Sequence, residues 1–76
     1  MFMLGDLEIR ILKMLEKKPI STFWLYDTLT KEGVHKLALE NAVKSLERKR
    51  LICVGLQLQL DENGKKMLTI LKNPQI

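Results

Sequence analysis

The chain of 76 residues is long enough for one small domain. It carries a formal net charge of +4, and its 46% hydrophobic and 29% charged residues are typical of a folded protein. No apolar run approaches the roughly 18 residues that span a bilayer. The opening MFML is too short for a secretory signal, and the single cysteine excludes an intramolecular disulfide. We therefore expect an intracellular, cytoplasmic protein, either associated with a nucleoid or encoded by a virus and acting in its host cell.

The positive charge is unevenly distributed along the sequence. Residues 1–33 carry five basic and five acidic side chains, whereas residues 34–52 carry five basic side chains against Glu40 and Glu47. Residues 53–76 contribute the remaining single positive charge. Positive charge concentrated in one segment is typical of a small surface that binds a polyanion. Net charge alone does not distinguish proteins that bind polyanions from those that do not.

The first predicted helix begins at Asp6, a candidate N-cap, and runs to about Lys18, where Pro19 ends it. Its apolar residues lie at helical spacing, which predicts that one face packs in the core. They are Leu7, Ile11, Met14 and Leu15.

The second predicted helix is capped by Ser21 or Thr22 and runs through about Glu32. Trp24 or Leu25, with Thr28 and Leu29, would lie near its inner side. Gly33 is a natural residue to follow it, because glycine readily takes the left-handed conformation that ends a helix. Trp24 and Tyr26 could also line a ligand pocket, but we favour core packing and turn contacts.

The third predicted helix follows a turn at residues 34–36 and runs from Leu37 to about Lys49. Its inner stripe is Leu39, Val43 and Leu46, and its outer side carries Asn41, Lys44 and Arg48, with Ser45 flanking them. Asparagine can pair with adenine, lysine reaches guanine or a phosphate, and arginine and serine contact phosphates. The same pattern also fits a core helix with a solvated back, so the helix alone does not decide between these interpretations.

Residues 51–60, LICVGLQLQL, predict a β-hairpin with Gly55-Leu56 as a two-residue type II′ turn. In that register Cys53 lies opposite Leu58 and Leu51 lies opposite Leu60, which makes one face apolar. Ile52 and Val54 then share the other face with Gln57 and Gln59. Cys53 is therefore expected to be a buried small hydrophobe rather than a redox-sensing thiol.

A final helix is predicted from the cap Asp61 to about Lys72, with Met67, Leu68 and Leu71 on its apolar side. The expected order is helix, helix, helix, hairpin, helix. The fold class is therefore mainly α with a small β-hairpin.

Three phrases of the sequence, taken in order, resemble the winged helix-turn-helix transcriptional regulators of the MarR and PadR families. They are EIRILKMLEKKPISTFWLYDTL (8–29), VHKLALENAVKSLERKRLI (34–52) and QLDENGKKMLTIL (59–71), and the hairpin lies where the wing of these families lies. The resemblance implies one winged-helix domain over residues 1–76. It also implies a homodimer that places the helix of about 37–49 in the major groove of DNA.

Two departures from the family pattern bear on this expectation. Arg50 stands where the family commonly has glycine, so the third helix must end differently here. No basic residue lies between Leu51 and Leu60. The minor-groove contact of a basic wing therefore does not carry over to this chain.

The candidate site residues form two sets. The first set is expected to contact DNA, with Asn41, Lys44 and Ser45 nearest the bases: His35, Lys36, Leu37, Asn41, Lys44, Ser45, Arg48, Lys49 and Arg50. The second set holds more apolar surface than one small core absorbs and is expected to form the dimer contact at the two ends of the chain: Phe2, Met3, Leu4, Met67, Leu68, Ile70 and Leu71.

The predicted function is that of a homodimeric transcriptional regulator that binds specific double-stranded DNA. The main alternative is a winged-helix module for protein–protein interaction, and a ligand-gated sensor is a distant third. We expect no enzyme, cofactor, metal or membrane contact. The sequence has no glycine-rich phosphate loop, and His35 has no cysteine or carboxylate at ligand spacing beside it.

Overall fold

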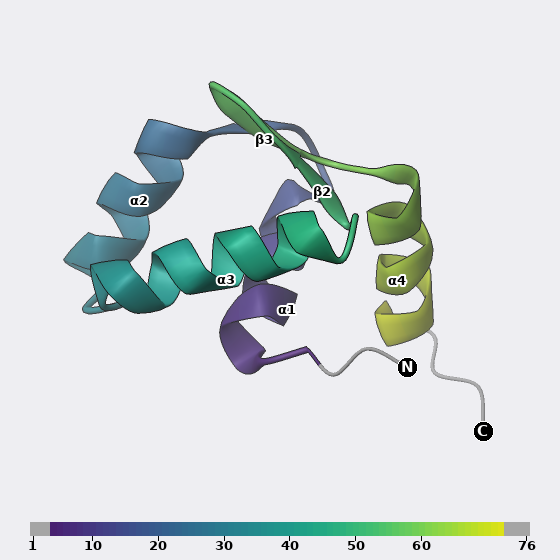
Figure 1. Ribbon diagram of the computed structural model, residues 1–76, viewed down its shortest axis with the longest axis horizontal. Coiled ribbons are helices and arrows are strands. Elements are labelled where there is room, and N and C mark those ends of the chain that lie inside the picture. Colours follow the sequence, from purple (N-terminus) through teal and green to yellow (C-terminus); the bar gives the residue numbers. More distant parts are fainter. Residues whose placement is uncertain (1–3, 73–76) are drawn as a thin grey trace.

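The computed structural model describes residues 4–72, a mainly helical chain with a small antiparallel sheet (Figure 1). Within this part the order is α1 (Asp6–Leu15), β1 (Ile20–Ser21), α2 (Thr22–Lys31), α3 (Lys36–Arg48), β2 (Ile52–Val54), β3 (Gln57–Leu60) and α4 (Glu62–Lys72). The strands lie in the order β1-β3-β2. Three helices, a hairpin and a final helix were predicted, and this arrangement is confirmed. Strand β1 was not predicted.

The elements enclose one core, which is lined by every helix and by β2 and β3. In Figure 1, α3 crosses in front of α1, and α2 and α4 stand at opposite ends of the molecule. The buried set confirms the predicted inner stripe of α3. It comprises Ile11, Leu12, Leu15, Leu25, Leu29, Leu39, Ala42, Val43, Leu46, Leu51, Ile52, Leu58 and Leu68.

The first two helices begin and end close to the predicted residues. Gly5, not Asp6, is the N-cap of α1, and this helix ends at Leu15, earlier than predicted. Ser21 caps α2 by accepting a 3.3 Å hydrogen bond from the N–H of Trp24. Of the two candidates for the inner side of α2, Leu25 is buried and Trp24 is exposed.

The C-terminal ends of α2 and α3 close with the same type of backbone hydrogen bond. Val34 N–H donates to the carbonyl of Leu29 and Leu51 N–H donates to the carbonyl of Leu46, each at 3.0 Å. This Schellman motif needs a left-handed residue after the helix. Gly33 fills that position at φ 100°, and Arg50 fills it at φ 62°. The expectation that a non-glycine must end α3 differently is wrong, since Arg50 adopts the strained conformation itself.

Replacing Arg50 with glycine is expected to stabilise the fold by about 1 kcal/mol, because a non-glycine residue pays roughly that amount for a left-handed conformation. Urea unfolding of the two proteins measures the difference. Arg50→Ala is the matched control, since it removes the same charge and keeps the Cβ that causes the strain. Equal stabilisation by both substitutions would assign the effect to charge instead of backbone strain.

The hairpin register differs by one residue from the predicted one. Ile52 pairs with Leu60, Cys53 with Gln59 and Val54 with Leu58. Gly33 is the one glycine with a positive φ among residues 4–72, so Gly55 does not form the type II′ turn that was predicted.

The added strand accounts for the shifted register. Strand β1 pairs with β3, and Ser21 lies opposite Gln57. Beside it, the Thr22 N–H donates to the carbonyl of Leu56 at 3.1 Å, and the Thr22 hydroxyl donates to the carbonyl of Gly55 at 2.8 Å. These contacts hold a longer turn. Because a shift of one residue reverses the faces of a strand, Cys53 is exposed, and its predicted burial is wrong.

The start of α4 lies directly against the backbone of Leu51, in the turn between α3 and β2. Asp61 precedes this helix as predicted, and its side chain accepts a 2.7 Å hydrogen bond from the N–H of Glu62. One turn later Gly64 is buried. A Cβ at Gly64 would lie 2.0 Å from the carbonyl oxygen of Leu51. Only glycine permits α4 to approach this closely.

No helix in the described range 4–72 has the length and apolar character that a membrane crossing demands.

Candidate nucleic-acid interface

The outward face of α3 carries a continuous exposed stripe that begins with an apolar side chain and continues with polar and cationic ones. Burial of Leu39, Val43 and Leu46 fixes the rotation of the helix about its axis. The opposite side therefore faces solvent, and Asn41, Lys44 and Arg48 are all exposed on it, as predicted. Leu37 begins the same stripe and is 58% exposed. The stripe of Leu37, Asn41, Lys44 and Arg48 is called the α3 stripe below.

The N-terminal end of α3 adds a second feature suited to an anion. His35 is the N-cap, and its Nδ1 accepts a 3.2 Å hydrogen bond from the N–H of Leu37. Lys36, the first helical residue, is exposed. The N-terminus of a helix carries partial positive charge and free N–H groups, so Lys36 adds a full charge at a position that already favours a phosphate.

A shallow groove of about 410 Å³ connects α2 to this end of α3. Phe23, Tyr26 and Thr30 line it from α2, and Lys36 lines it from α3. Burial, followed by the negative charge of Glu40, raises the pKa of Tyr26 above its ordinary value, so its hydroxyl stays protonated.

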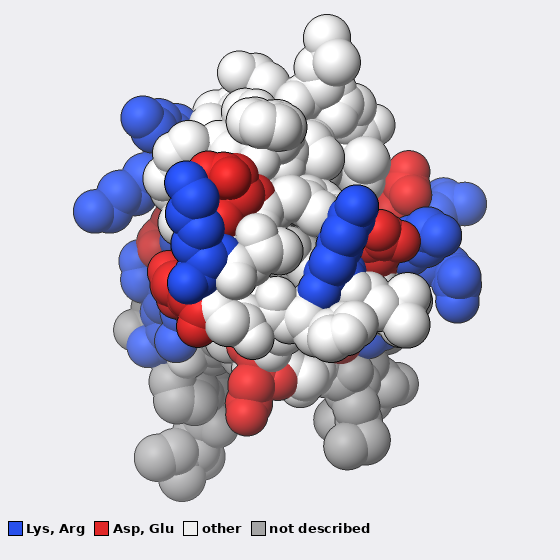
Figure 2. Space-filling view, turned by 90° about the vertical axis from the view of Figure 1, so that its left-hand side faces the viewer, with Lys and Arg blue, Asp and Glu red and all other residues white. Residues whose placement is uncertain are grey.

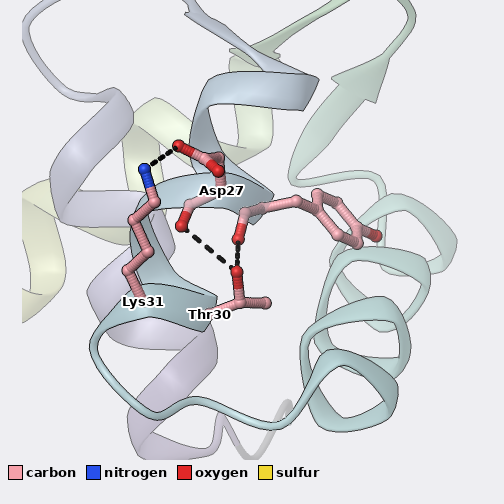
Figure 3. A network of polar contacts seen from close by, with 4 residues as sticks. Asp27, Thr30 and Lys31 are labelled. Carbon is pink, nitrogen blue, oxygen red and sulfur yellow. Dashed lines mark hydrogen bonds and ion pairs between the residues drawn. The ribbon is translucent and has the colours of Figure 1, made fainter.

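Three polar side chains of α2 beside this groove have their partners within the same helix (Figure 3). Lys31 forms a 3.0 Å ion pair with Asp27, and the Thr30 hydroxyl donates to the carbonyls of Tyr26 and Asp27. In Figure 3 the labelled side chains Asp27, Thr30 and Lys31 all lie against α2 itself. This part of the surface is therefore locally neutralised, and the cationic character of the groove comes from Lys36.

Two predicted DNA-contact residues point away from the α3 stripe, toward α1. Lys49 forms a 3.0 Å ion pair with Glu8. The hydroxyl of Ser45 also hydrogen-bonds to this carboxylate. The structure therefore uses both residues to join α3 to α1. Position 49 lies seven residues after buried Ala42, on the same side of the helix, and this spacing is the signal that indicates its inner position.

Glu8 was not among the predicted site residues, yet it organises this contact. Its side chain is only 13% exposed. Burial alone would raise the pKa of Glu8, but hydrogen bonds from Gly5 N–H, Lys49 and Ser45, together with the charge of Lys49, lower it below the ordinary value of 4.5. A lowered pKa means that the ionised carboxylate stabilises the folded state.

Acidification is expected to remove the stabilisation that the ionised Glu8 carboxylate gives to the folded state. Because the folded pKa of Glu8 lies below the unfolded one, its stabilisation is complete above about pH 4.5 and is lost as the pH falls through the folded pKa. Glu8→Gln should lower the free energy of unfolding at pH 7 by roughly 1–2 kcal/mol and flatten its decline below pH 4.5. Urea unfolding at pH 7, 5 and 3 tests this expectation. Glu47→Gln, an exposed change on α3, is the control, and an equal effect there would contradict the role of Glu8.

The hairpin presents an apolar tip next to the start of α2. Leu56 is 95% exposed, and Val54 beside it is also exposed. Phe23, two residues after the β1 residue Ser21, is 81% exposed, and the hydrogen bonds of Thr22 hold the tip beside this part of α2. Arg50 is exposed in the turn before β2. The hairpin therefore offers apolar surface at its tip and a single cation at its base.

The predicted dimer residues fall into three groups. Phe2 and Met3 lie outside the described residues. Leu68 is 3% exposed and belongs to the core of the single chain, so it is not open to a partner. Leu4, Met67 and Leu71 are half-buried and Ile70 is 60% exposed.

Figure 2 shows the face on the side of α2, where lysine and arginine side chains alternate with acidic ones around a largely uncharged centre and top. Within residues 4–72 no three histidine, cysteine or acidic side chains gather where they could hold a metal ion.

Comparisons with protein-family models, with curated proteins and with solved structures found no match to this chain. The α3 stripe and the groove beside Lys36 are therefore the features of this chain that bear on its function.

Proposed function

We propose that this protein is a winged helix-turn-helix regulator of transcription that binds double-stranded DNA as a homodimer, with α3 in the major groove. The observation that carries the proposal is the α3 stripe, which is exposed along the length of the helix. Helices α2 and α3 would form the helix-turn-helix, and β2 and β3 the wing. The strand order β1-β3-β2 behind them is compatible with this arrangement.

Each side chain of the α3 stripe has a chemical counterpart on duplex DNA. Asn41 can pair with adenine through two hydrogen bonds, Lys44 can donate to guanine, and Leu37 can contact the methyl group of thymine. Arg48, near the end of the helix, is placed for a backbone phosphate. Lys36 at the helix start provides a second phosphate contact, so the two ends of α3 fix its position and the middle selects sequence.

The wing contributes little charge to this mode of binding. No basic residue lies between Leu51 and Leu60. The cationic contacts of one protomer then come from Lys36, Lys44, Arg48 and Arg50. Since Lys49 is paired with Glu8, it is left out of this set.

The homodimer is part of the proposal because one half-site of three or four base contacts gives limited specificity. Ile70, on the outer side of α4, is the most exposed of the candidate contact residues that the structure describes. Leu4 and Met67 pack against the core, and half-buried Leu71 completes the surface that we assign to the partner protomer.

A protein–protein interaction module is the second candidate, and one observation favours it. Phe23 and Trp24 in the first turn of α2 and Leu56 at the hairpin tip are all exposed, and the hydrogen bonds of Thr22 join these two segments. Clustered exposed apolar side chains are typical of a surface that binds another protein. This candidate predicts that binding to a partner does not depend on Lys44 or Arg48.

Fluorescence anisotropy of a labelled duplex, titrated with the protein at several salt concentrations, tests the DNA proposal. Each phosphate contact should contribute roughly −0.9 to the slope of log K against log salt concentration. With two to four contacts per protomer, we expect a slope of about −2 to −4 for each half-site. Absence of binding to any duplex from a random pool at low salt would contradict the proposal.

A further inference from the structure

A second concave surface lies where the end of α1 meets α4. This cleft has a volume of about 460 Å³, and no residue of α3 lines it. Three segments form its walls: residues 15–19 after α1, residues 59–60 at the end of β3, and residues 65–72 of α4. The cleft is thus separate from the α3 stripe.

The rim of this cleft is cationic. Lys17 and Lys18 lie on the wall after α1, and Lys65 lies on the wall formed by α4. All three side chains are exposed, and none takes part in the ion pairs found among residues 4–72. The one carboxylate that lines the cleft, Glu16, is already paired with Lys72. The cleft therefore presents uncompensated positive charge.

Helix dipoles account for only part of this arrangement. Lysines just after α1 lie at the end of a helix where partial negative charge favours cations. Lys65 lies in the first turns of α4, where the helix carries partial positive charge and a lysine gains nothing from the dipole. A bound anion would be stabilised by both Lys65 and this end of α4.

The floor of the cleft is apolar, in contrast to its rim. Leu15 and Leu68 are almost fully buried at its base, and Leu60 is half-buried beside them. The hydroxyl of Thr69 donates to the carbonyl of Lys65 at 3.1 Å, so it has no hydrogen to offer a ligand. Lysine ammonium groups only donate hydrogen bonds. A complementary ligand therefore needs an anionic acceptor group and an apolar body.

We propose that this cleft binds a small amphipathic anion, namely a carboxylate or phosphate monoester on an apolar body. The anionic group lies between Lys65 and the lysines at residues 17–18, and the apolar body covers Leu60 and the exposed edges of Leu15 and Leu68. The volume lies within the range of about 300–1,000 Å³ that small-molecule sites occupy.

Amide NMR spectra recorded during titration with octanoate test this proposal on the full chain. We expect saturable shifts at residues 15–19, 59–60 and 65–72. Octanol, which has the same chain without charge, and acetate, which has the charge without the chain, should each bind about tenfold or more weakly. Octyl phosphate distinguishes the two head groups, and tighter binding of either one supports the proposal and identifies the group.

Charge variants separate the site from the general charge of the protein. Lys17→Gln, Lys18→Gln and Lys65→Gln combined should weaken octanoate binding about tenfold or more. The control combines Lys13→Gln, Lys31→Gln and Lys66→Gln, which remove equal charge outside the cleft and should change binding less than about twofold. Octanol or acetate binding as tightly as octanoate, equal losses in both variants, or no shifts in the cleft would each overturn the proposal. Unfolding curves confirm that both variants remain folded.

Discussion

Gly64→Ala is expected to destabilise the protein by about 3 kcal/mol or more, at the upper end of the cost of overpacking. The new Cβ would lie 2.0 Å from the carbonyl oxygen of Leu51 and 3.0 Å from its carbonyl carbon. These are backbone atoms, so no side-chain rotation relieves the clash. The carbonyl of Leu51 also accepts a 2.9 Å hydrogen bond from the N–H of Asp61. Alanine at position 64 therefore forces α4 away from Leu51. It also disturbs the hydrogen bond between Asp61 and Leu51, which lies directly before α4.

Helix propensity alone predicts the opposite result, namely that Gly64→Ala stabilises the protein. The sign of the change in the free energy of unfolding therefore distinguishes the clash from propensity. In a helix interior alanine is favoured over glycine by about 1 kcal/mol. Urea unfolding followed by circular dichroism measures the change. Gly55→Ala is the control, since its Cβ would meet its nearest atom at an ordinary 3.8 Å, and a change of less than about 1 kcal/mol is expected there. A Gly64→Ala protein as stable as the parent would contradict the close packing of α4 on Leu51.

Combined substitution of Lys44 and Arg48 by glutamine is expected to weaken binding to duplex DNA at least about thirtyfold. Each contact of this kind is worth about 1–3 kcal/mol, and 2 kcal/mol corresponds to about thirtyfold in affinity. Both side chains are exposed on the α3 stripe, so their loss should leave the free energy of unfolding almost unchanged. Anisotropy titrations at fixed salt measure the loss.

The matched control for this pair is Lys13→Gln with Lys66→Gln, which removes the same charge from exposed positions on α1 and α4. We expect the control to weaken binding by no more than about threefold, through the long-range field alone. An equal loss in both double variants would mean that DNA responds to net charge and not to the α3 stripe.

The elements that the sequence predicts best are those defined by local chemistry. Gly33 ends α2 with a positive φ, and Ser21 caps that helix, because both effects depend on a few neighbouring residues. The inner stripe of α3 follows from helical spacing alone. By contrast, Arg50 takes a left-handed conformation that its residue type disfavours, since the packing of Leu51 beneath α4 determines the path of the chain.

The errors in the predicted sheet share one cause. Strand β1 is only two residues long, Ile20–Ser21, and is too short to leave an alternating pattern. Its pairing with β3 and the two hydrogen bonds of Thr22 are contacts between segments far apart in the sequence. They select a register in which Cys53 is exposed, whereas turn chemistry alone favours the register that buries it.

Part of the candidate site could be predicted from the sequence, as the inner stripe of α3 could. Asn41, Lys44 and Arg48 share one face by spacing, and the structure exposes all three. Residue type does not separate Lys49 and Ser45 from them, because their partner Glu8 lies some 40 positions away along the chain. For Lys49, the seven-residue spacing from Ala42 is the one sequence signal of its inner position. The cationic cleft was also beyond prediction, since its walls come from three separate segments.

The most direct test of the DNA proposal is the amide NMR spectrum of the protein as duplex DNA is added. The duplex should carry the sequence that the protein selects from a random pool. The proposal predicts that the largest shifts fall on residues 36–48, with the strongest at Leu37, Asn41, Lys44 and Arg48. Shifts that concentrate instead on the cleft residues 15–19 and 65–72, or no shifts at low salt, would contradict the assignment of α3 as the DNA-binding helix.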